Sequence, residues 1–210
     1  HEGLESLQGA LVVSQRDSGE LLALVGDKDG GYAGHNWALD KTRQVGSLVK
    51  PVVHLSALES GRYHLMSAVD DGPIAVPQAD GSVWKPQNYD LTSHGVVPMY
   101  QALVKSYNQA NVRLGIDVGV KRVVAQLQRL GAEGNIPAYP SVLLGAVEMS
   151  PLNVNQVYQT IAGNGFYSPL TLVRQVTEAN GVLLSHFPYA VRQAASNESV
   201  YLLQQEMRKV

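Results

Sequence analysis

Residues 43–51 read RQVGSLVKP, and Ser47 opens an apolar run whose spacing predicts a helix over residues 47–60. Ser47 and Lys50 are three residues apart, so in a helix their side chains would project from the same face, one turn apart. A serine hydroxyl is a weak nucleophile that must lose its proton during attack. A lysine can accept that proton once burial or a nearby positive field lowers its pKa. The spacing therefore predicts Ser47 as a nucleophile and Lys50 as its base.

A second polar pair lies further along the chain. Residues 105–108 read KSYN, which places Ser106 and Asn108 two apart in a stretch, residues 98–115, that also predicts a helix. A second hydroxyl can relay a proton between the lysine and a leaving amine, and an asparagine amide can accept from the lysine and donate to a substrate carbonyl. Together the two motifs form most of the residue set of a serine acyl-transfer enzyme with a lysine base. The usual third element, a Lys-Thr-Gly or Lys-Ser-Gly strand, is absent from the sequence.

Neither motif is specific on its own. Taken alone, Ser47 reads equally well as a helix N-cap beside a solvated lysine, and Ser106 with Asn108 as polar positions on an exposed helix face. A second serine-lysine match runs from Ser82 to Lys85, but it lies in a turn-rich segment before a proline, where no helix would align the pair. We therefore reject this second match as a catalytic pair.

The whole-chain composition narrows the function classes. The chain has 210 residues, is 45% apolar and carries a formal net charge of -2, which suits a globular domain and gives no electrostatic reason to expect nucleic acid as a partner. It has no cysteine, so disulfides, thiolate metal sites and a thiol nucleophile are excluded. The six histidines lack a Glu or His at metal spacing, so we expect no metal and no other cofactor. We expect His54, on the first predicted helix, to be packed or half-exposed.

The rest of the pattern predicts an α+β fold with an incomplete sheet. Residues 27–36 form a Gly-rich loop without the lysine of a phosphate-binding loop, and residues 70–95 are loop-like. Two hairpins are expected, over residues 9–15 with 20–26 and residues 170–178 with 182–186, and further helices over residues 118–130, 151–162 and 197–210.

Several segments, in this order, resemble the transpeptidase domain of class A (bifunctional) penicillin-binding proteins, nearest the 1b type. The resemblance covers most of the chain. It lies in residues 10–13 with 18–20, the group Arg43, Gly46, Ser47, Lys50 and Pro51, and the segments 85–90 (KPQNYD), 102–108 (ALVKSYN), 144–146 with 150–152, and 158–165 (YQTIAGNG).

The resemblance implies a fold and a chemistry. The fold would be that of penicillin-binding transpeptidases and serine β-lactamases, an antiparallel sheet flanked by helices. By position, Ser47 would be the acylated nucleophile, Lys50 its general base, Ser106 the proton relay and Asn108 a substrate contact. The substrate would be the D-Ala-D-Ala end of a peptidoglycan stem peptide, and β-lactams would acylate the same serine.

Parts of the family pattern are missing. The resemblance makes residues 1–210 the N-terminal and central part of a single transpeptidase domain, which stops before the Lys-Thr-Gly strand. We therefore expect a C-terminal segment that carries this strand as a partner. The glycosyltransferase domain and membrane anchor typical of the class would precede His1, which implies a location at the periplasmic face of the bacterial inner membrane. Val45 and Val49, where many relatives have Pro and Phe, are mild variations.

Three alternative functions stay open. A serine β-lactamase shares both motifs, and Glu148 with Leu152-Asn153 resembles the deacylating loop of class A β-lactamases, with one residue too many between them. We prefer to interpret Glu148 as preceding a helix that begins at Pro151. In a D,D-carboxypeptidase, water would replace the acceptor amine. A non-catalytic β-lactam sensor or interaction module would keep the fold without turnover.

Overall fold

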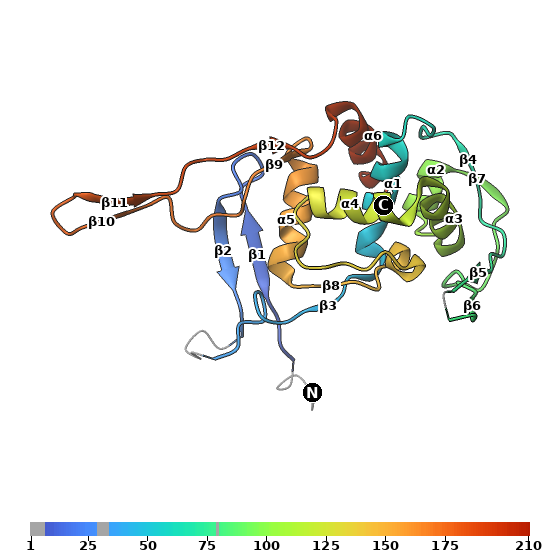
Figure 1. Cartoon of the computed structure of the whole chain (residues 1–210), viewed down its shortest axis with the longest axis horizontal. Coiled ribbons are helices and arrows are strands. Elements are labelled where there is room, and N and C mark those ends of the chain that lie inside the picture. Colours follow the sequence, from blue (N-terminus) through green and yellow to red (C-terminus); the bar gives the residue numbers. More distant parts are fainter. Residues whose placement is uncertain (1–6, 29–33, 79) are drawn as a thin grey trace. The chain divides into compact units, whose positions relative to one another are not determined.

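The computed structural model describes residues 7–28, 34–78 and 80–210, so residues 29–33 of the predicted Gly-rich loop lie outside the described residues. The chain forms two compact units. Unit 1 takes in the described residues up to Arg43, with Leu130–Glu133 and Met149–Ala194, and unit 2 takes in Gln44–Arg129, Gly134–Glu148 and Ala195–Val210. Runs of strands and runs of helices follow one another along the chain, and the strand pairs are antiparallel, so the fold is α+β, as predicted (Figure 1). That the chain is part of one transpeptidase domain stays a prediction.

Unit 2 is built around one buried helix, α1 (Lys50–Glu59), which a short 3-10 helix, Gly46–Val49, precedes. Every residue from Lys50 to Leu58 is buried, including His54, which was expected to be packed or half-exposed and is packed. A helix that is buried on all sides must be covered by other elements, and here a layer of helices covers it. That layer is formed by α2 (Met99–Val104), α3 (Asn108–Val118), α4 (Val120–Arg129) and α6 (Asn197–Met207) (Figure 1).

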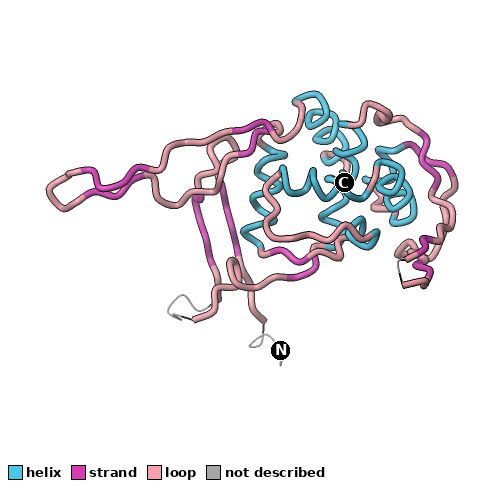
Figure 2. The backbone as a smooth tube through the Cα atoms, viewed as in Figure 1, coloured by secondary structure: helices cyan, strands magenta, loops and turns pink. Residues whose placement is uncertain are grey.

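A long irregular segment of unit 2 joins α1 to α2. It is mostly loop, as predicted, with four short strands that pair antiparallel, β4 (Ala68–Asp70) with β7 (Val96–Pro98) and β5 (Val76–Pro77) with β6 (Val83–Trp84) (Figure 2). A second 3-10 helix covers Pro140–Leu144. Strands β3 (Arg43–Gln44) and β8 (Glu148–Met149) lie where the chain passes from one unit to the other.

The prediction of one helix over residues 98–115 was wrong, because the chain forms α2 and α3 with a break at residues 105–107. The N–H of Tyr107 bonds to Ala102 O and that of Ser106 to Leu103 O, both at 2.9 Å, and Ser106 has a φ of +55°. This is the Schellman ending of a helix, in which glycine usually takes the left-handed position. With serine there, the sequence carries no glycine or proline to mark the break.

Unit 1 holds the other strands and one helix. The expected first hairpin is β1 (Leu11–Ser14) with β2 (Leu21–Val25), and α5 (Pro151–Ala162) packs against β1. Ser150 caps α5 by accepting from the N–H of Asn153 at 3.2 Å, so this helix begins where the sequence predicts. Two more antiparallel pairs follow, β9 (Phe166–Tyr167) with β12 (Arg192–Gln193) and β10 (Gln175–Thr177) with β11 (Leu183–His186).

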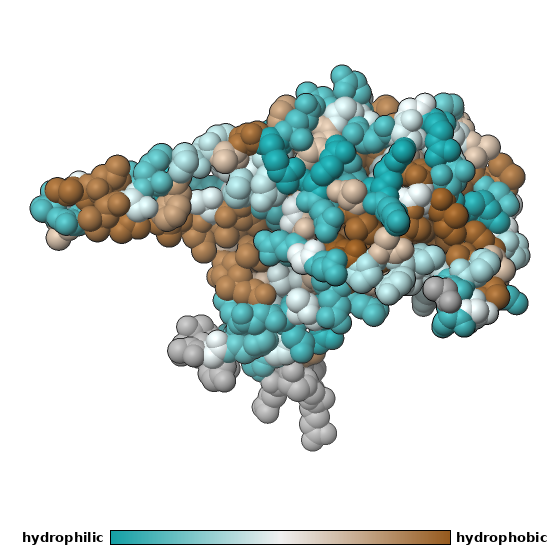
Figure 3. Space-filling model, in the orientation of Figure 1, coloured by the Kyte–Doolittle hydropathy of each residue, from teal (hydrophilic) through white to brown (hydrophobic). Residues whose placement is uncertain are grey.

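The β10–β11 hairpin exposes apolar side chains. All seven of its strand residues are exposed, so both faces of the ribbon meet solvent. Val176, Leu183 and Leu184 are among the exposed apolar residues, and Figure 3 shows hydrophobic colour along this ribbon. An isolated two-stranded hairpin is only marginally stable, so this element depends on its β-turn and on the cross-strand pairs for its shape.

None of the helices in the described ranges has the length and apolarity needed to cross a membrane.

Gly145 permits a close approach of two backbone segments in unit 2. It ends the 3-10 helix Pro140–Leu144 with a φ of +81°, and its carbonyl accepts from the N–H of Gly46 at 3.2 Å. A Cβ atom on Gly145 would lie 2.1 Å from Gly46 O and 2.3 Å from Gly46 N. Since both contacts are to backbone, no side chain can move aside to relieve them.

We therefore expect Gly145→Ala to destabilise the protein by more than its φ alone would. Gly134 is the matched control, because it has a φ of +82° and no heavy atom lies within 4 Å of the point where its Cβ would stand. Gly134→Ala should cost about 1–2 kcal/mol from the left-handed backbone, and Gly145→Ala about 1–3 kcal/mol more from overpacking. Urea unfolding of both variants measures the difference, and equal losses would show that the approach of Gly46 is not limiting.

Candidate active site

Ser47 lies in the 3-10 helix that leads into α1, and its side chain is exposed. The sequence favours this start, because Gly46 adopts a left-handed φ of +56° and Pro51 falls in the first turn of α1, where a missing N–H does no harm. The α-helix itself begins at Lys50, three residues later than predicted. Ser47 and Lys50 are thus joined by one tight turn at the N-terminal end of a buried helix.

The Lys50 side chain points into the protein and is only 1% exposed. Its Nζ donates to three oxygens, Ser106 O at 2.5 Å, Ser106 Oγ at 2.8 Å and Asn108 Oδ1 at 2.6 Å. An ammonium has three hydrogens, so the three acceptors match its full donor capacity. Both predicted motifs therefore meet at this nitrogen.

Ser106 links the lysine to the exposed serine. Its hydroxyl accepts from Lys50 Nζ and donates to Ser47 Oγ at 3.2 Å. The sequence reasoning expected the lysine to reach Ser47 directly, whereas the structure connects the two through the second hydroxyl. The connection forms a continuous route for a proton between Ser47 and Lys50.

Burial changes the acidity of the lysine. Removal from water lowers the pKa of the Lys50 ammonium to about 8, and the negative charge of Asp71 acts in the opposite direction. At mildly basic pH a substantial fraction of Lys50 is therefore the neutral amine, which is the form that can accept a proton.

Asn108 is oriented by the loop that contains Gln87 and Asn88. It is the first residue of α3, its backbone N–H donates to Asn88 Oδ1 at 2.7 Å, and its Nδ2 donates to Gln87 O at 2.7 Å. Because Nδ2 is held by Gln87, the amide oxygen is the atom that faces Lys50. The family resemblance covered residues 85–90. The local sequence, however, shows Asn88 only as a polar residue among turn residues, which does not predict its contact with Asn108.

The rejected pair and His54 take no part in this arrangement. Ser82 donates its hydroxyl to Asp80 Oδ1 at 2.6 Å, and β6 follows it, so no helix aligns it with Lys85. His54 lies opposite Glu206, with Nδ1 and Oε2 3.3 Å apart and both side chains inaccessible to solvent. Among the described residues, no group of three or more His, Asp or Glu side chains is arranged to hold a metal ion.

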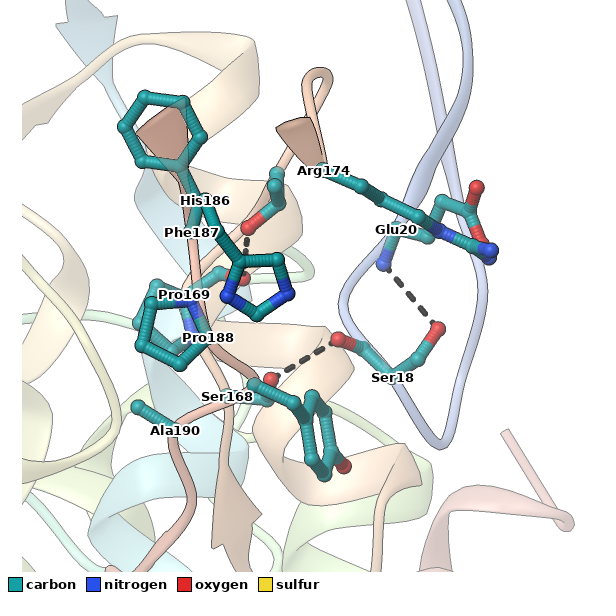
Figure 4. A pocket seen from close by; sticks show the side chains of 11 residues that line it. Ser18, Glu20, Ser168, Pro169, Arg174, His186, Phe187, Pro188 and Ala190 are labelled. Carbon is teal, nitrogen blue, oxygen red and sulfur yellow. Dashed lines mark hydrogen bonds and ion pairs between the residues drawn. The ribbon is translucent and has the colours of Figure 1, made fainter. Parts of the chain in front are cut away.

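Unit 1 contains a separate hollow of about 520 Å³, lined by residues that include Ser18, Glu20, Ser168, Arg174 and His186 (Figure 4). Two serines and a histidine could suggest a second nucleophile. However, Ser18 Oγ accepts from the N–H of Glu20 and Ser168 Oγ donates to Ser18 O, so both hydroxyls bond to backbone groups (Figure 4). The lining of this hollow includes none of the four predicted site residues, Ser47, Lys50, Ser106 and Asn108.

The site of unit 2 has the parts that activate a serine for acyl transfer: an exposed hydroxyl, a relay and a buried amine. Residues 9–210 match the family model described as "Penicillin binding protein transpeptidase domain". The chain therefore belongs to the family of penicillin-binding protein transpeptidase domains. This confirms the family and the fold that the sequence motifs indicated, nearest the class A 1b type.

Curated relatives and solved structures agree. The chain is 38% identical to Penicillin-binding protein 1B of Vibrio cholerae over 207 residues, which cover 98% of this chain and 27% of the relative. It is also 38% identical to Penicillin-binding protein 1B of Escherichia coli over 212 residues, 99% of this chain and 25% of the relative. It thus spans about a quarter of the length of these relatives.

Among solved structures, Penicillin-Binding Protein 1A from Haemophilus influenzae superposes with a TM-score of 0.86 at 23% identity, covering 95% of this chain and 34% of that chain. An imipenem acyl-enzyme complex of penicillin-binding protein A from M. tuberculosis superposes with a TM-score of 0.81 at 22% identity, covering 96% of this chain and 57% of that chain. At these identities the superpositions establish the shared fold.

Glu148 occupies the position that sequence reasoning preferred. It lies exposed in β8, and α5 begins three residues later at Pro151. Ser150, between them, is used as the cap of α5. The local sequence around Glu148 thus serves to begin a helix, as the sequence interpretation proposed.

A direct titration tests the state of Lys50. We expect its side-chain signal in heteronuclear NMR to titrate with a midpoint near pH 8 instead of the ordinary 10.5, because burial disfavours the ammonium. The unfolded chain then holds more protons than the folded one between these pH values, so stability should rise with pH across that window. Lys50→Arg assigns the signal by removing it. An ordinary midpoint would contradict the buried environment.

Proposed function

We propose that this chain supplies the nucleophile and base of a peptidoglycan D,D-transpeptidase that forms a serine acyl-enzyme with D-Ala-D-Ala stem peptides. The observation that carries the proposal is the hydrogen-bonded route from Ser47 Oγ through Ser106 Oγ to the buried Lys50 Nζ. Family membership supports the acyl-transfer class. Because the chain spans only about a quarter of its curated relatives, the activity of the whole protein is part of this proposal.

In the reactive state Lys50 is a neutral amine. The two N–H groups of this amine can donate to Ser106 O and Asn108 Oδ1, which leaves its lone pair facing Ser106 Oγ. Ser106 passes its proton to Lys50 and takes the proton of Ser47, whose oxygen bonds to the carbonyl carbon of the penultimate D-Ala. The negative charge on the carbonyl oxygen develops near the N-terminal end of α1, where the helix dipole favours it.

The proton then returns along the same route. Collapse of the tetrahedral intermediate breaks the peptide bond, and the leaving D-Ala amine takes a proton from Lys50 through Ser106, which leaves Lys50 neutral again. The amine of a neighbouring stem peptide then attacks the ester of Ser47, and the same groups remove that amine's proton. They return the proton to the Ser47 oxygen as its bond to the acyl carbon breaks. A β-lactam would follow the first half only, since ring opening leaves its amine tethered to the acyl group.

The proposal extends to partners and location. We infer that a C-terminal segment with a Lys-Thr-Gly strand completes the cleft, that the substrates are stem peptides on glycan strands, and that the protein works at the periplasmic face of the inner membrane through an anchor outside this chain. The β-lactam complexes named for M. tuberculosis penicillin-binding protein A support β-lactams as ligands of the same kind of site.

Intact-mass spectrometry tests the nucleophile. The full-length polypeptide is incubated with a β-lactam whose acyl-enzyme hydrolyses slowly. We expect a mass increase of one drug molecule, which Ser47→Ala abolishes. Ser82→Ala is the matched control, because Ser82 begins the second serine-lysine match and should leave the adduct unchanged. The mass of the untreated polypeptide also reports whether it extends beyond these 210 residues.

The other functions predict different results. Rapid hydrolysis of the drug with only transient acylation would favour a β-lactamase, and a stable adduct without transfer to an acceptor amine would favour a sensor. Release of D-Ala from a model peptide with water as the only acceptor would favour a carboxypeptidase. Absence of any adduct, with the polypeptide folded and complete, would contradict acyl transfer altogether.

A further inference from the structure

A buried carboxylate, Asp71, lies behind the proposed active site and is inaccessible to solvent. It directly follows β4, and the sequence suggested only a turn there, in the run Asp71-Gly72-Pro73. Its Oδ2 accepts from Asn88 Nδ2 at 2.6 Å and from the backbone N–H of His94 at 3.2 Å, and it lies 2.8 Å from His94 Nδ1. Its Oδ1 accepts from the N–H of Ala110 at 3.0 Å. A turn aspartate needs none of these long-range partners.

These contacts hold the first turn of α3. The first N–H groups of a helix have no partner within the helix, and the residue before it usually caps them. Tyr107, which precedes α3, makes no side-chain cap. Instead Asn88 Oδ1 accepts from the N–H groups of Asn108 at 2.7 Å and Gln109 at 3.3 Å, while Asp71 takes Ala110. The carboxylate also places negative charge at the positive end of the helix dipole.

The same first turn carries the acceptor for Lys50. Asn108 is the first residue of α3, and its Oδ1 accepts from Lys50 Nζ. A displacement of this turn would move Asn108 Oδ1, and with it Ser106, two residues earlier in the chain. The geometry around the lysine is therefore set by two residues, Asp71 and Asn88, that do not touch it by any hydrogen bond in the described structure.

The charged groups around Asp71 come from several segments. His94 faces it with Nδ1, and the other ring nitrogen of His94 lies 3.1 Å from Asp90 Oδ2. The His94 ring stacks on Tyr107, with centroids 4.0 Å apart, so this side of the cluster also supports the turn that holds Ser106. Lys50 is the cation on which the charge of Asp71 acts. Arg113 of α3 pairs with the neighbouring Asp70.

We infer that Asp71, with Asn88, is a positioning residue of the acylation machinery: it fixes the start of α3, and thereby Asn108 and Ser106, against Lys50, and its charge acts on that lysine. This inference rests on the proposed function for its effect on acylation. Its effect on Lys50 itself does not depend on any substrate, which allows the two to be tested separately.

Two variants separate the geometric part from the charge. Asp71→Asn removes the charge and turns one oxygen into a donor that faces the Asn88 amide, so both parts are lost. Asn88→Ala removes the cap of Asn108 and keeps the charge. Asp80→Asn is the matched control, because Asp80 is a carboxylate of the same long segment whose described hydrogen bonds go to Ser82, away from the cluster.

The experiment measures the rate constant of acylation by a fluorescent penicillin across the pH range, and the NMR midpoint of Lys50 in each variant. For Asp71→Asn we expect the plateau rate to fall about tenfold or more, as for a misplaced catalytic group. Both the pH midpoint of acylation and that of Lys50 should move to lower pH, since the charge that favours the ammonium is gone. Asn88→Ala should lower the plateau without moving the midpoints, and Asp80→Asn should match the wild type.

The outcomes distinguish the possible failures. A merely structural role for Asp71 would lower stability, or the fraction of active protein, and leave both midpoints unmoved, which would overturn the inference. Wild-type acylation in Asn88→Ala would overturn its geometric part, even if Asp71→Asn failed to fold. If the wild type were not acylated at all, the proposed function would fail, and the Lys50 midpoint would still decide whether Asp71 acts on the lysine.

Discussion

The arrangement of unit 2 depends on the burial of one ammonium group. Taking a lysine charge out of water costs several kcal/mol unless every hydrogen finds an acceptor. Lys50 is enclosed by the helices around α1, so the protein must bring three oxygens to its nitrogen. Those oxygens come from two residues of one turn, Ser106 and Asn108. The break between α2 and α3 thus gives the buried lysine the three acceptors that it needs.

The turn that satisfies Lys50 is held from outside its own sequence. Neither α2 nor α3 caps the start of α3, and the long segment between β4 and β7 supplies the missing acceptors through Asn88 and Asp71. A mostly irregular segment therefore carries out a task that local capping usually performs. The side chains of Asp71 and Asn88 can be buried in this loop because each accepts hydrogen bonds from the first turn of α3.

Much of the architecture could be predicted from the sequence because local patterns determine it. The helix at Pro151–Ala162 has its serine cap and its proline in the first turn, and the two hairpins have clear turn residues. The placing of Ser47 and Lys50 one turn apart followed from their spacing, whereas their connection through the hydroxyl of Ser106 did not. The α2–α3 break did not, because Ser106 stands where glycine would have marked it. Nor did Asp71, because an aspartate before Gly-Pro looks like a turn residue until distant partners are known.

The left-handed backbone of Ser106 places stability and activity in opposition within one residue. A glycine would adopt a φ of +55° without strain, whereas an L-residue with a Cβ atom pays about 1–2 kcal/mol for it. Yet a glycine would lack the hydroxyl that bridges Lys50 and Ser47. Selection for thermal tolerance alone would favour glycine at this position, and selection for activity would oppose it. A stabilised form of this protein would therefore have to gain its stability elsewhere in the chain.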